Sequence, residues 1–425
     1  MKHKILLFVL ASLMVALNGE AQDFWETLPF PDGTNIYCIA INNEGDIFVG
    51  TVYDYGLPGG VYRSLDNGQS WDLVLNLGTF GVLSLDINAE GRIYAGTNDP
   101  YSVYSSSNNG LNWNGLSVPQ RFNVLDIQCF GTDTVFVSQW DNSGGLVIRS
   151  PDCGQTWETV FTTQNGSEYV SDIEITDEGS IYLSLEGFYS GEGGVYKSEN
   201  NGVTWEFIGL FDCMVTSLVI NNAGDLFAGS WGGSSIYNAS IYVLRNGHQD
   251  WDTLTYEQMI TDMVINTEGH IYCSSSWPYG VVRSLDNGAS FQPITEGLTQ
   301  GDIGDLAIDN LGYIYITTYY GSNFLAKSVG PTVTIFEHQI KKGGERILLY
   351  PNPCKANLYV EIESTVCTGT ALIKIYNCNG MLVHKQEVKY FDNVMQFETA
   401  GFKPGIYQIV VMVNNEYFSS TFVKS

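Results

Sequence analysis

The sequence predicts an all-β protein built mainly from one repeated four-stranded unit, and two observations lead to this prediction. A strand, a tight turn and a second strand recur seven times, as in "IAINNEGDIFVGT" (39–51) and "LDINAEGRIYAGT" (85–97). The stretch "SLDNGQSW" (64–71) returns in altered form at 106, 150, 198 and 284, with a decayed copy ending at Trp251. Apolar residues that alternate on both sides of Asn-Glu-Gly or Asp-Glu-Gly are typical of β-hairpins, because these turns need residues that accept positive φ.

The spacing of the repeat predicts how many units there are. The closing aromatic residue of each unit recurs every 40 to 48 residues, at Trp71, Trp113, Trp157, Trp205, Trp251 and Phe291. This period matches a propeller blade of four strands. The seventh hairpin lacks a closing strand, but "DFWETLPF" (23–30) has the form of "SWDLVLNL", and Trp25 precedes Trp71 by 46 residues. We therefore predict a seven-bladed β-propeller over residues 22–330 that the N-terminal strand closes.

The motif S-x-D-x-G-x-T-W resembles the Asp-box (BNR) repeat of sialidases, sortilin-type receptors, xyloglucanases and related secreted propellers. The resemblance covers residues 23–329. It implies that the box forms the turn between the third and fourth strands, where Asp side chains bond turn amides and the aromatic ring packs at the blade edge. The residue chemistry agrees, since Asx side chains satisfy turn N–H groups and Gly supplies the unusual dihedral angle. We interpret "SLDNGQSW" as architecture and not as a metal or catalytic site.

The ends and the charge of the chain indicate export. Residues 1–21 combine Lys2 and Lys4 with an apolar run, which is typical of a secretory signal peptide and too short to span a bilayer. No transmembrane segment is expected. The formal net charge of -27 disfavours nucleic acid and anionic lipid as partners. No C-x-x-C or H-x-x-x-H spacing occurs among the 8 Cys and 5 His, so we expect neither a metal nor a cofactor. The pairing of the cysteines stays open.

A linker at 331–345 separates the propeller from residues 346–425, whose short alternating strands predict a small Ig-like β-sandwich. The order of "YPNP", "IYNCNG", "KPGIYQIVV" and a terminal Lys resembles the C-terminal sorting domain of the type IX secretion system. The matching positions are Tyr350, Pro351, Asn352, Pro353, Gly380, Pro404, Gly405, Tyr407 and Lys424. The resemblance implies contact with the type IX machinery and a secreted or outer-membrane surface location in a Gram-negative bacterium. The alternative is an accessory sandwich module.

Aromatic residues occur in every predicted loop from the second to the third strand of a blade. They are Tyr53, Tyr55, Tyr101, Trp140, Phe188, Tyr189, Trp231, Trp277, Tyr279, Tyr319 and Tyr320. Flat rings among hydroxyl and carboxyl groups suit a sugar, and an exposed aromatic patch also suits a protein partner. The alternative for any one ring is packing between blades. We expect these loops to bind a glycan or an extracellular protein.

A second set of candidates lies on the predicted innermost strands, where four acids share one register: Asp126, Asp172, Asp262 and Asp305. Converging carboxyl groups are suited to glycoside hydrolysis or to calcium binding. Cys38, Ser84 and Ser217 occupy the same register in other units, which favours a small polar packing position in which each side chain bonds the backbone of a neighbouring blade.

Enzyme function is the second hypothesis and not the first. A sialidase needs three arginines around the substrate carboxylate, and the arginines of this propeller lie beside the boxes or in turns, apart from Arg121. Xyloglucanase-like enzymes use a cleft between two propellers, and one is predicted here. We therefore expect a secreted or cell-surface, non-catalytic propeller; the identity of the ligand and the use of a surface anchor stay open.

Overall fold

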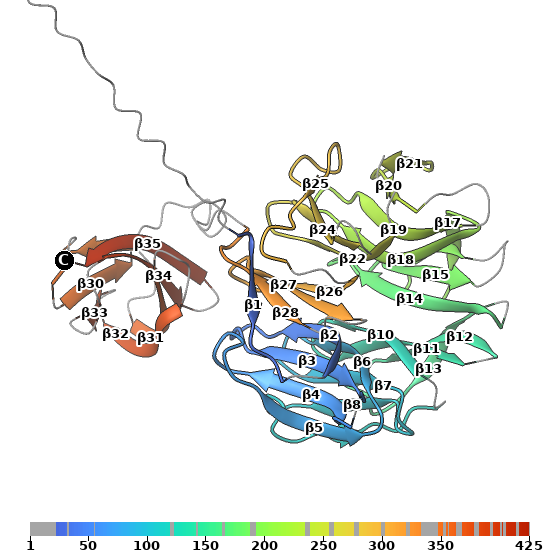
Figure 1. Ribbon diagram of the computed structural model, residues 1–425, viewed down its shortest axis with the longest axis horizontal. Helices are drawn as coiled ribbons and strands as arrows, with labels where there is room; N and C mark the ends of the chain where they lie inside the picture. The colour runs from blue at the N-terminus through green and yellow to red at the C-terminus, as the bar shows by residue number, and fades with distance from the viewer. Residues whose placement is uncertain are drawn as a thin grey trace, which may run out of the picture.

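Seven antiparallel sheets of four strands each surround a common axis, with the first strand of each sheet innermost (Figure 1). This computed structural model describes residues 23–424 except 32–33, 55, 120–122, 142, 164–165, 188–192, 234–238, 255–258, 276–279, 299–301, 320–323, 333–346, 352–353, 356, 363–367, 378–381, 392–393, 400–401, 403–404 and 414–415. The predicted signal peptide and most of the predicted linker lie outside the described residues. No helix in the described part is long and apolar enough to cross a membrane.

The first four blades follow one another along the chain. Blade 1 contains β2 (Asn35–Ile41), β3 (Ile47–Val52), β4 (Gly59–Ser64) and β5 (Asp72–Gly78). Blade 2 contains β6 (Val82–Ile87), β7 (Ile93–Thr97), β8 (Val103–Ser106) and β9 (Asn114–Gly115). Blade 3 contains β10 (Asn123–Phe130), β11 (Thr134–Asp141), β12 (Gly144–Ser150) and β13 (Glu158–Thr162). Blade 4 contains β14 (Glu168–Ile175), β15 (Ile181–Gly187), β16 (Gly194–Ser198) and β17 (Glu206–Gly209).

The last three blades complete the circle. Blade 5 contains β18 (Cys213–Ile220), β19 (Leu226–Gly233), β20 (Ile241–Leu244) and β21 (Trp251–Leu254). Blade 6 contains β22 (Ile260–Ile265), β23 (Ile271–Ser275), β24 (Val281–Ser284) and β25 (Gln292–Pro293). Blade 7 contains β26 (Asp302–Ile308), β27 (Ile314–Tyr319) and β28 (Leu325–Ser328), and its outermost strand is β1 (Trp25–Leu28) from the start of the described chain.

The seventh blade confirms the predicted closure by the N-terminal strand. β1 pairs antiparallel with β28, with Trp25 opposite Ser328. The Trp25 side chain is 2 % exposed, and its Nε1 donates to the carbonyl oxygen of Ile294 in blade 6 at 2.6 Å. Burial of an indole group of this size contributes on the order of 3 kcal/mol. The two ends of the propeller are therefore held together by strand pairing and by packing.

The predicted box turns lie between the third and fourth strands. In blade 1, Asp66 Oδ1 accepts from the Ser64 hydroxyl at 2.8 Å and from the Ser70 amide at 2.9 Å, and Asp66 Oδ2 accepts from the Ser70 hydroxyl at 2.6 Å. Asn67 has φ 59° and Gly68 has φ 84°. Burial acts against ionisation, but the bonds from Ser70 and Ser64 leave the pKa of Asp66 below its usual value. All bonding of this carboxylate stays within its turn, as an architectural role requires.

The C-terminal domain is one seven-stranded sheet that folds back on itself. Its order is β29 (Ile347–Tyr350), β30 (Asn357–Ile362), β33 (Val394–Glu398), β32 (Leu382–Phe391), β31 (Thr368–Asn377), β34 (Gly405–Val413) and β35 (Glu416–Lys424). Its two edges meet through a parallel bridge between Cys354 and Lys424. Side chains such as Leu358, Ile373 and Ile409 are fully buried between the layers. This arrangement confirms the predicted Ig-like sandwich.

Candidate functional site

The loops that join the second strand of a blade to the third, and each blade to the next, emerge at one end of the propeller, which we call the upper face. The predicted loop aromatics divide in the described part of this face. Tyr53, Tyr101 and Trp231 are 47 %, 53 % and 42 % exposed. Rings this large and this exposed are available to a ligand.

Trp140 behaves differently from these three residues. It lies at the end of β11 and packs edge to face against Tyr169 of blade 4, with the ring centroids 5.9 Å apart. Trp140 is only partly exposed, so the packing alternative holds for it. The remaining candidates are undecided: Tyr55, Phe188, Tyr189, Trp277, Tyr279 and Tyr320 lie outside the described residues, and Tyr319 lies in β27 without a described side chain.

A cavity of about 480 Å³ lies on the propeller axis, and we call it the axial cavity. Its walls come from the inner strands of all seven blades, together with Trp231 of β19. The four acids predicted to share a register, Asp126, Asp172, Asp262 and Asp305, all line it, and Asp86 adds a fifth carboxyl group. The structure thus brings these acids together around one axis, and their proposed roles stay a hypothesis.

A β-bulge in every inner strand shapes this cavity. The pairing of the first and second strands shifts register at Ile36/Cys38 in blade 1, and the same shift occurs at the equivalent point of the other six blades. A bulge leaves one extra residue on the bulged strand and redirects its side chain. All seven extra residues line the cavity: Tyr37, Leu83, Leu125, Ser171, Thr216, Thr261 and Gly304.

The residue after each bulge residue bonds the next blade. Asp126 Oδ2 accepts from the amide of Ile173 at 2.9 Å, and Asp172 Oδ2 accepts from that of Leu218 at 2.5 Å. Across the next junctions, Asp262 Oδ2 accepts from Leu306 at 2.8 Å and Asp305 Oδ2 from Ile39 at 2.8 Å.

At two other junctions between blades, a serine hydroxyl accepts the equivalent hydrogen bond. Ser84 Oγ accepts from the amide of Ile127 at 3.0 Å, and Ser217 Oγ accepts from that of Met263 at 3.1 Å. We call this set of bonds the inner hydrogen-bond ring. Each of the four acids thus carries a structural bond to a neighbouring blade.

The protonation of the carboxyl groups follows from their setting. Burial raises the pKa of Asp305 to about 6 and that of Asp126 to about 7, even though backbone amides bond both groups. Burial and the nearby carboxyl groups of Asp126 and Glu174 raise the pKa of Asp172 well above its usual value. Burial and Asp305 act in the same direction on the pKa of Asp262. Burial therefore disfavours the charged form of all four carboxyl groups, and each of them serves as a hydrogen-bonding group.

Sequence reasoning missed the bulges, but the second strand of the repeat does distinguish the units that carry an acid from those that do not. The second-strand residue opposite Cys38, Ser84 and Ser217 is Gly50, Gly96 and Gly229 in turn. Opposite Asp126, Asp172 and Asp262 it is a serine, and the Asp305 amide donates to the Thr317 hydroxyl oxygen at 2.9 Å. At Gly96 an added Cβ would lie 2.2 Å from Val124 of the next blade. Opposite Asp126, the hydroxyl of Ser138 accepts from the Asp126 amide at 3.0 Å and donates to the Val170 carbonyl at 2.9 Å.

The propeller arginines serve the opposite, lower face. Arg63 Nη1 donates to the carbonyl oxygen of Asn109, a box residue of the next blade, at 2.6 Å. Arg149 donates in the same way to Asn201. Arg245 Nη2 lies 3.4 Å from the equivalent oxygen of Asn287. None of these three arginines is therefore placed to hold a substrate carboxylate on the upper face.

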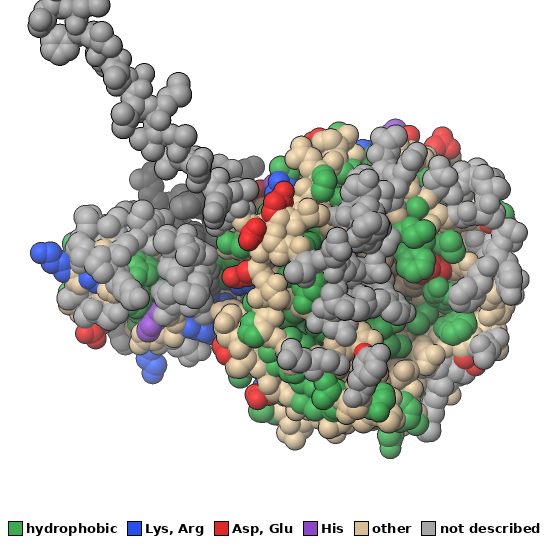
Figure 2. Space-filling view, viewed as in Figure 1, with side chains coloured by type: hydrophobic (Ala, Val, Ile, Leu, Met, Phe, Trp, Pro, Cys, Tyr) green, Lys and Arg blue, Asp and Glu red, His purple; other side chains and the backbone are tan. Residues whose placement is uncertain are grey.

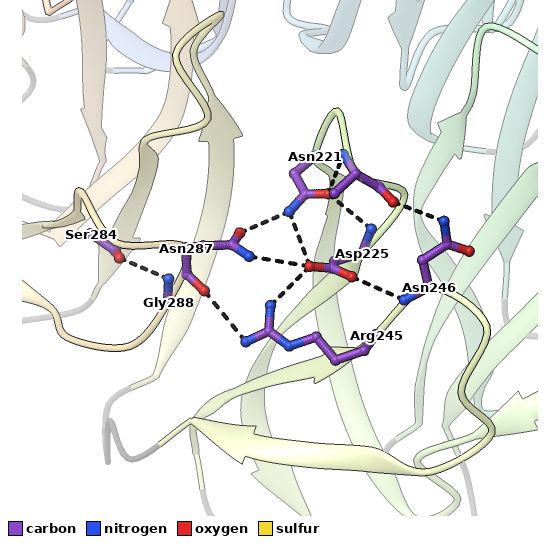
Figure 3. Close-up of polar contacts among 8 residues, drawn as sticks. Asn221, Asp225, Arg245, Asn246, Ser284, Asn287 and Gly288 are labelled. Atoms are coloured by element: carbon purple, nitrogen blue, oxygen red, sulfur yellow. Dashed lines mark hydrogen bonds and ion pairs between the residues drawn. The ribbon is translucent and has the colours of Figure 1, made fainter.

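Figure 3 shows the polar contacts that link the decayed box of blade 5 to the box of blade 6. Asp225 Oδ2 accepts from Arg245 Nη1 at 2.9 Å and from Asn287 of blade 6 at 3.2 Å, and its Oδ1 accepts from the Asn246 amide at 2.9 Å. Burial opposes ionisation, but these donors and Asn221 lower the pKa of Asp225 to about 2. The cluster joins two blades and is complete without a ligand.

Metal-binding and disulfide chemistry have little support in the described residues. No group of three or more His, Cys, Asp or Glu in this part of the chain is arranged to hold a metal ion. Five cysteines of the described part are free thiols, namely Cys38, Cys129, Cys153, Cys213 and Cys273.

Comparison with known proteins identifies the C-terminal domain. Residues 348–425 match the family described as the secretion system C-terminal sorting domain. The C-terminal domain is a type IX sorting domain. The protein is accordingly secreted or displayed at the cell surface. Of the matching positions, Tyr350 is exposed and stacks on Tyr359, whereas Tyr407 and Lys424 are buried. Asn352, Pro353, Gly380 and Pro404 lie outside the described residues.

Solved structures confirm the propeller fold. PorZ of Porphyromonas gingivalis, an essential surface component of the type IX secretion system, matches with 12 % identity and a TM-score of 0.54 over 94 % of this chain and 61 % of its own. The chain thus spans less than two thirds of PorZ.

Two further propellers match similarly. The GH74 enzyme of Niastella koreensis matches with 15 % identity and a TM-score of 0.54, over 95 % of this chain and 74 % of its own. YCF48 of Cyanidioschyzon merolae matches with 11 % identity and a TM-score of 0.55, over 72 % and 98 %. A comparison with curated protein sequences gives no match. These identities establish the fold alone.

Proposed function

We propose that the mature protein is an extracellular binding module that holds a glycan on the upper face of its propeller and has no catalytic activity. The observation that carries this proposal is the exposure of Tyr53, Tyr101 and Trp231 on one face. The C–H face of a sugar stacks on such rings, and neighbouring hydroxyl groups fix its orientation. The sorting domain supports a location where extracellular glycans are within reach.

The bonding of the axial acids favours binding over hydrolysis. A glycosidase needs one carboxyl group that is free to protonate the leaving oxygen and another that attacks the sugar or activates water. Here Asp126, Asp172, Asp262 and Asp305 each bond a backbone amide of the next blade. Hydrolysis by these acids stays the alternative.

A protein partner is the second candidate, because other exposed side chains on the upper face lack polar groups. Phe80, Phe211 and Met259 lie in the loops that connect one blade to the next, and they are 39 %, 58 % and 48 % exposed. Apolar surface of this kind is typical of a protein interface.

Native affinity electrophoresis of the chain from residue 22 onward tests the proposal. Gels that contain soluble starch, mannan, xylan or galactan should retard the protein in at least one case. Trp231→Ala should abolish most of that retardation, because the indole ring supplies stacking area at low entropic cost.

Tyr350→Ala is the matched control, since Tyr350 has the same 42 % exposure but lies in the sorting domain. It should leave the mobility unchanged. Equal mobility of the wild-type protein in all gels would contradict the glycan proposal and move the weight to a protein partner.

A further inference from the structure

The axial cavity has one apolar side and one polar side, and the bulge residues create this division. Tyr37, Leu83 and Leu125 project into the cavity from blades 1, 2 and 3. Tyr37 is 41 % exposed. The three residues form a contiguous apolar arc, which we call the apolar arc.

The next three blades contribute hydroxyl groups, which we call the polar arc. Ser171 Oγ donates to the carbonyl oxygen of Val215 at 2.7 Å, Thr216 Oγ1 to that of Ile260 at 2.8 Å and Thr261 Oγ1 to that of Ile303 at 2.9 Å. Because each proton is committed to the following blade, these hydroxyl oxygens can act toward a ligand only as acceptors. The oxygens of Ser171 and Thr261 also lie 2.9 Å and 2.6 Å from the hydroxyl oxygens of Ser184 and Ser274.

The cavity therefore offers many acceptors and few donors. The five carboxyl groups of the lining add acceptor oxygens, with an O–H donor only where a group is protonated, and no described lining residue is Lys, Arg or His. Residues 22–330 carry 37 Asp and Glu against 8 Lys and Arg. Figure 2 shows basic side chains mainly over the C-terminal domain, to the left in this view. Such a site disfavours carboxylate, sulfate and phosphate groups and suits a ligand that donates hydrogen bonds.

The shape of the cavity limits how a polymer can enter. Inner strands of all seven blades wall the cavity, so it is bounded in every direction around the axis. The interior of a linear polysaccharide needs a groove that is open at both ends, whereas a cavity walled on all sides admits only a chain end or a branch. A volume of about 480 Å³ lies within the ordinary range for a small-molecule site.

We propose that the axial cavity binds a single neutral sugar residue at the end or branch of a glycan chain, with its C–H face on the apolar arc and its hydroxyl groups donating to the polar arc. This inference rests on the proposed function and adds to it the sugar class and the direction of entry. Trp231, which also lines the cavity, extends the site toward the loop aromatics.

Competition in the electrophoresis assay tests chain-end recognition. The polysaccharide of the panel that retards the protein is partially hydrolysed to give about ten times as many chain ends per gram, and a second sample is oxidised to carry uronic acid groups. The hydrolysed sample should compete about tenfold better per gram than the intact polymer. The oxidised sample should compete poorly.

Variants separate the cavity from the loops. Tyr37→Ala and Thr216→Val should each weaken binding about tenfold, since each removes one partner of the sugar. Tyr37→Phe and Thr216→Ser keep the ring and the hydroxyl group and should bind normally, which controls for folding.

The outcomes also separate the two proposals. Competition that follows polymer mass, or loss of binding in Tyr53→Ala but not in Tyr37→Ala, would overturn the cavity inference and leave the proposed function standing. Absence of retardation by every polymer of the panel would overturn both.

Discussion

The carboxyl group of Asp172 is a hydrogen-bond acceptor first and an ionisable group second. It bonds the Leu218 amide of the next blade, and burial with its acidic neighbours keeps the pKa of Asp172 high. An amide side chain can take over this role, because it retains an acceptor oxygen and carries no charge. A methyl group cannot, and it leaves a buried amide unbonded.

Substitution of Asp172 should therefore show whether its side chain stabilises the fold through its hydrogen bond to the next blade. Asp172→Ala should destabilise the protein by about 1–3 kcal/mol, the usual cost of an unsatisfied buried amide, whereas Asp172→Asn should change stability by less than about 0.5 kcal/mol. Urea unfolding monitored by tryptophan fluorescence measures both, and Asp252→Asn on the exposed edge of β21 is the neutral control.

The same substitution decides the hydrolase alternative. Asp172→Asn combined with Asp262→Asn should leave the polysaccharides of the panel as unchanged as the wild-type protein does, when reducing ends are measured. Release of reducing ends by the wild-type protein, lost in the double variant at unchanged stability, would establish catalysis.

At the scale of the element, β1 closes the propeller, and its residue Trp25 should contribute more to stability than the equivalent residue of blade 1, Trp71. Trp25 is buried and bonds Ile294 of blade 6, whereas Trp71 is only partly buried at the blade edge and bonds Pro29. Trp25→Ala should destabilise the protein by about 3–5 kcal/mol, and Trp71→Ala should cost clearly less. Thermal unfolding followed by circular dichroism compares the two; equal losses would contradict a special role for the closing strand.

The elements also show what the sequence could and could not predict. Hairpins such as 39–51 were predictable, because Asn-Glu-Gly turns and alternating apolar residues are local signals. The closure was predictable because "DFWETLPF" repeats a form seen elsewhere in the chain. The bulges were not, since alternation places Tyr37 and Cys38 on opposite faces of the strand, and only the pairing with β3 shows the shift. The polar arc depends on those bulges and was missed with them.

The sequence could not predict which of the loop aromatic side chains are partly buried, for a similar reason. Trp140 and Tyr101 have similar loop surroundings in the sequence. Trp140 nevertheless packs on Tyr169 of the following blade, whereas Tyr101 stays exposed beside Tyr104. Contacts between blades decide the difference, and such contacts join residues far apart in the chain.

On the scale of the whole molecule, two sets of polar contacts join neighbouring blades. The inner hydrogen-bond ring joins neighbouring blades near the axis, and the arginine contacts join alternate pairs of blades on the lower face. The two sets respond differently to acid. Asp225 on the lower face has a lowered pKa of about 2, whereas Asp126 and Asp305 on the axis have raised pKa values of about 7 and about 6.

Stability should accordingly fall as pH rises from about 4 to about 8. Unfolded aspartates have a pKa near 3.9, so across this window the native state holds more protons on its axial acids than the unfolded chain does. Unfolding then releases protons, and each additional proton held by the native state lowers the unfolding free energy by about 1.4 kcal/mol per pH unit. Repulsion within a chain of net charge -27 acts in the same direction. Asp225, whose pKa is lowered to about 2, opposes the trend only at the acid end of the window, where unfolded aspartate still holds part of its proton.

Urea unfolding at pH 4.5, 6 and 7.5 measures this slope. The wild-type protein should be most stable at pH 4.5, and the Asp172→Asn, Asp262→Asn double variant should show a shallower decline because two proton-binding groups are gone from the axis. A sugar in the axial cavity should raise stability at each pH by an amount that depends on its concentration relative to its Kd. Stability that increases between pH 4.5 and 7.5 would mean that the axial acids are ionised in the native protein, and the acceptor role assigned to them would then have to be that of carboxylates.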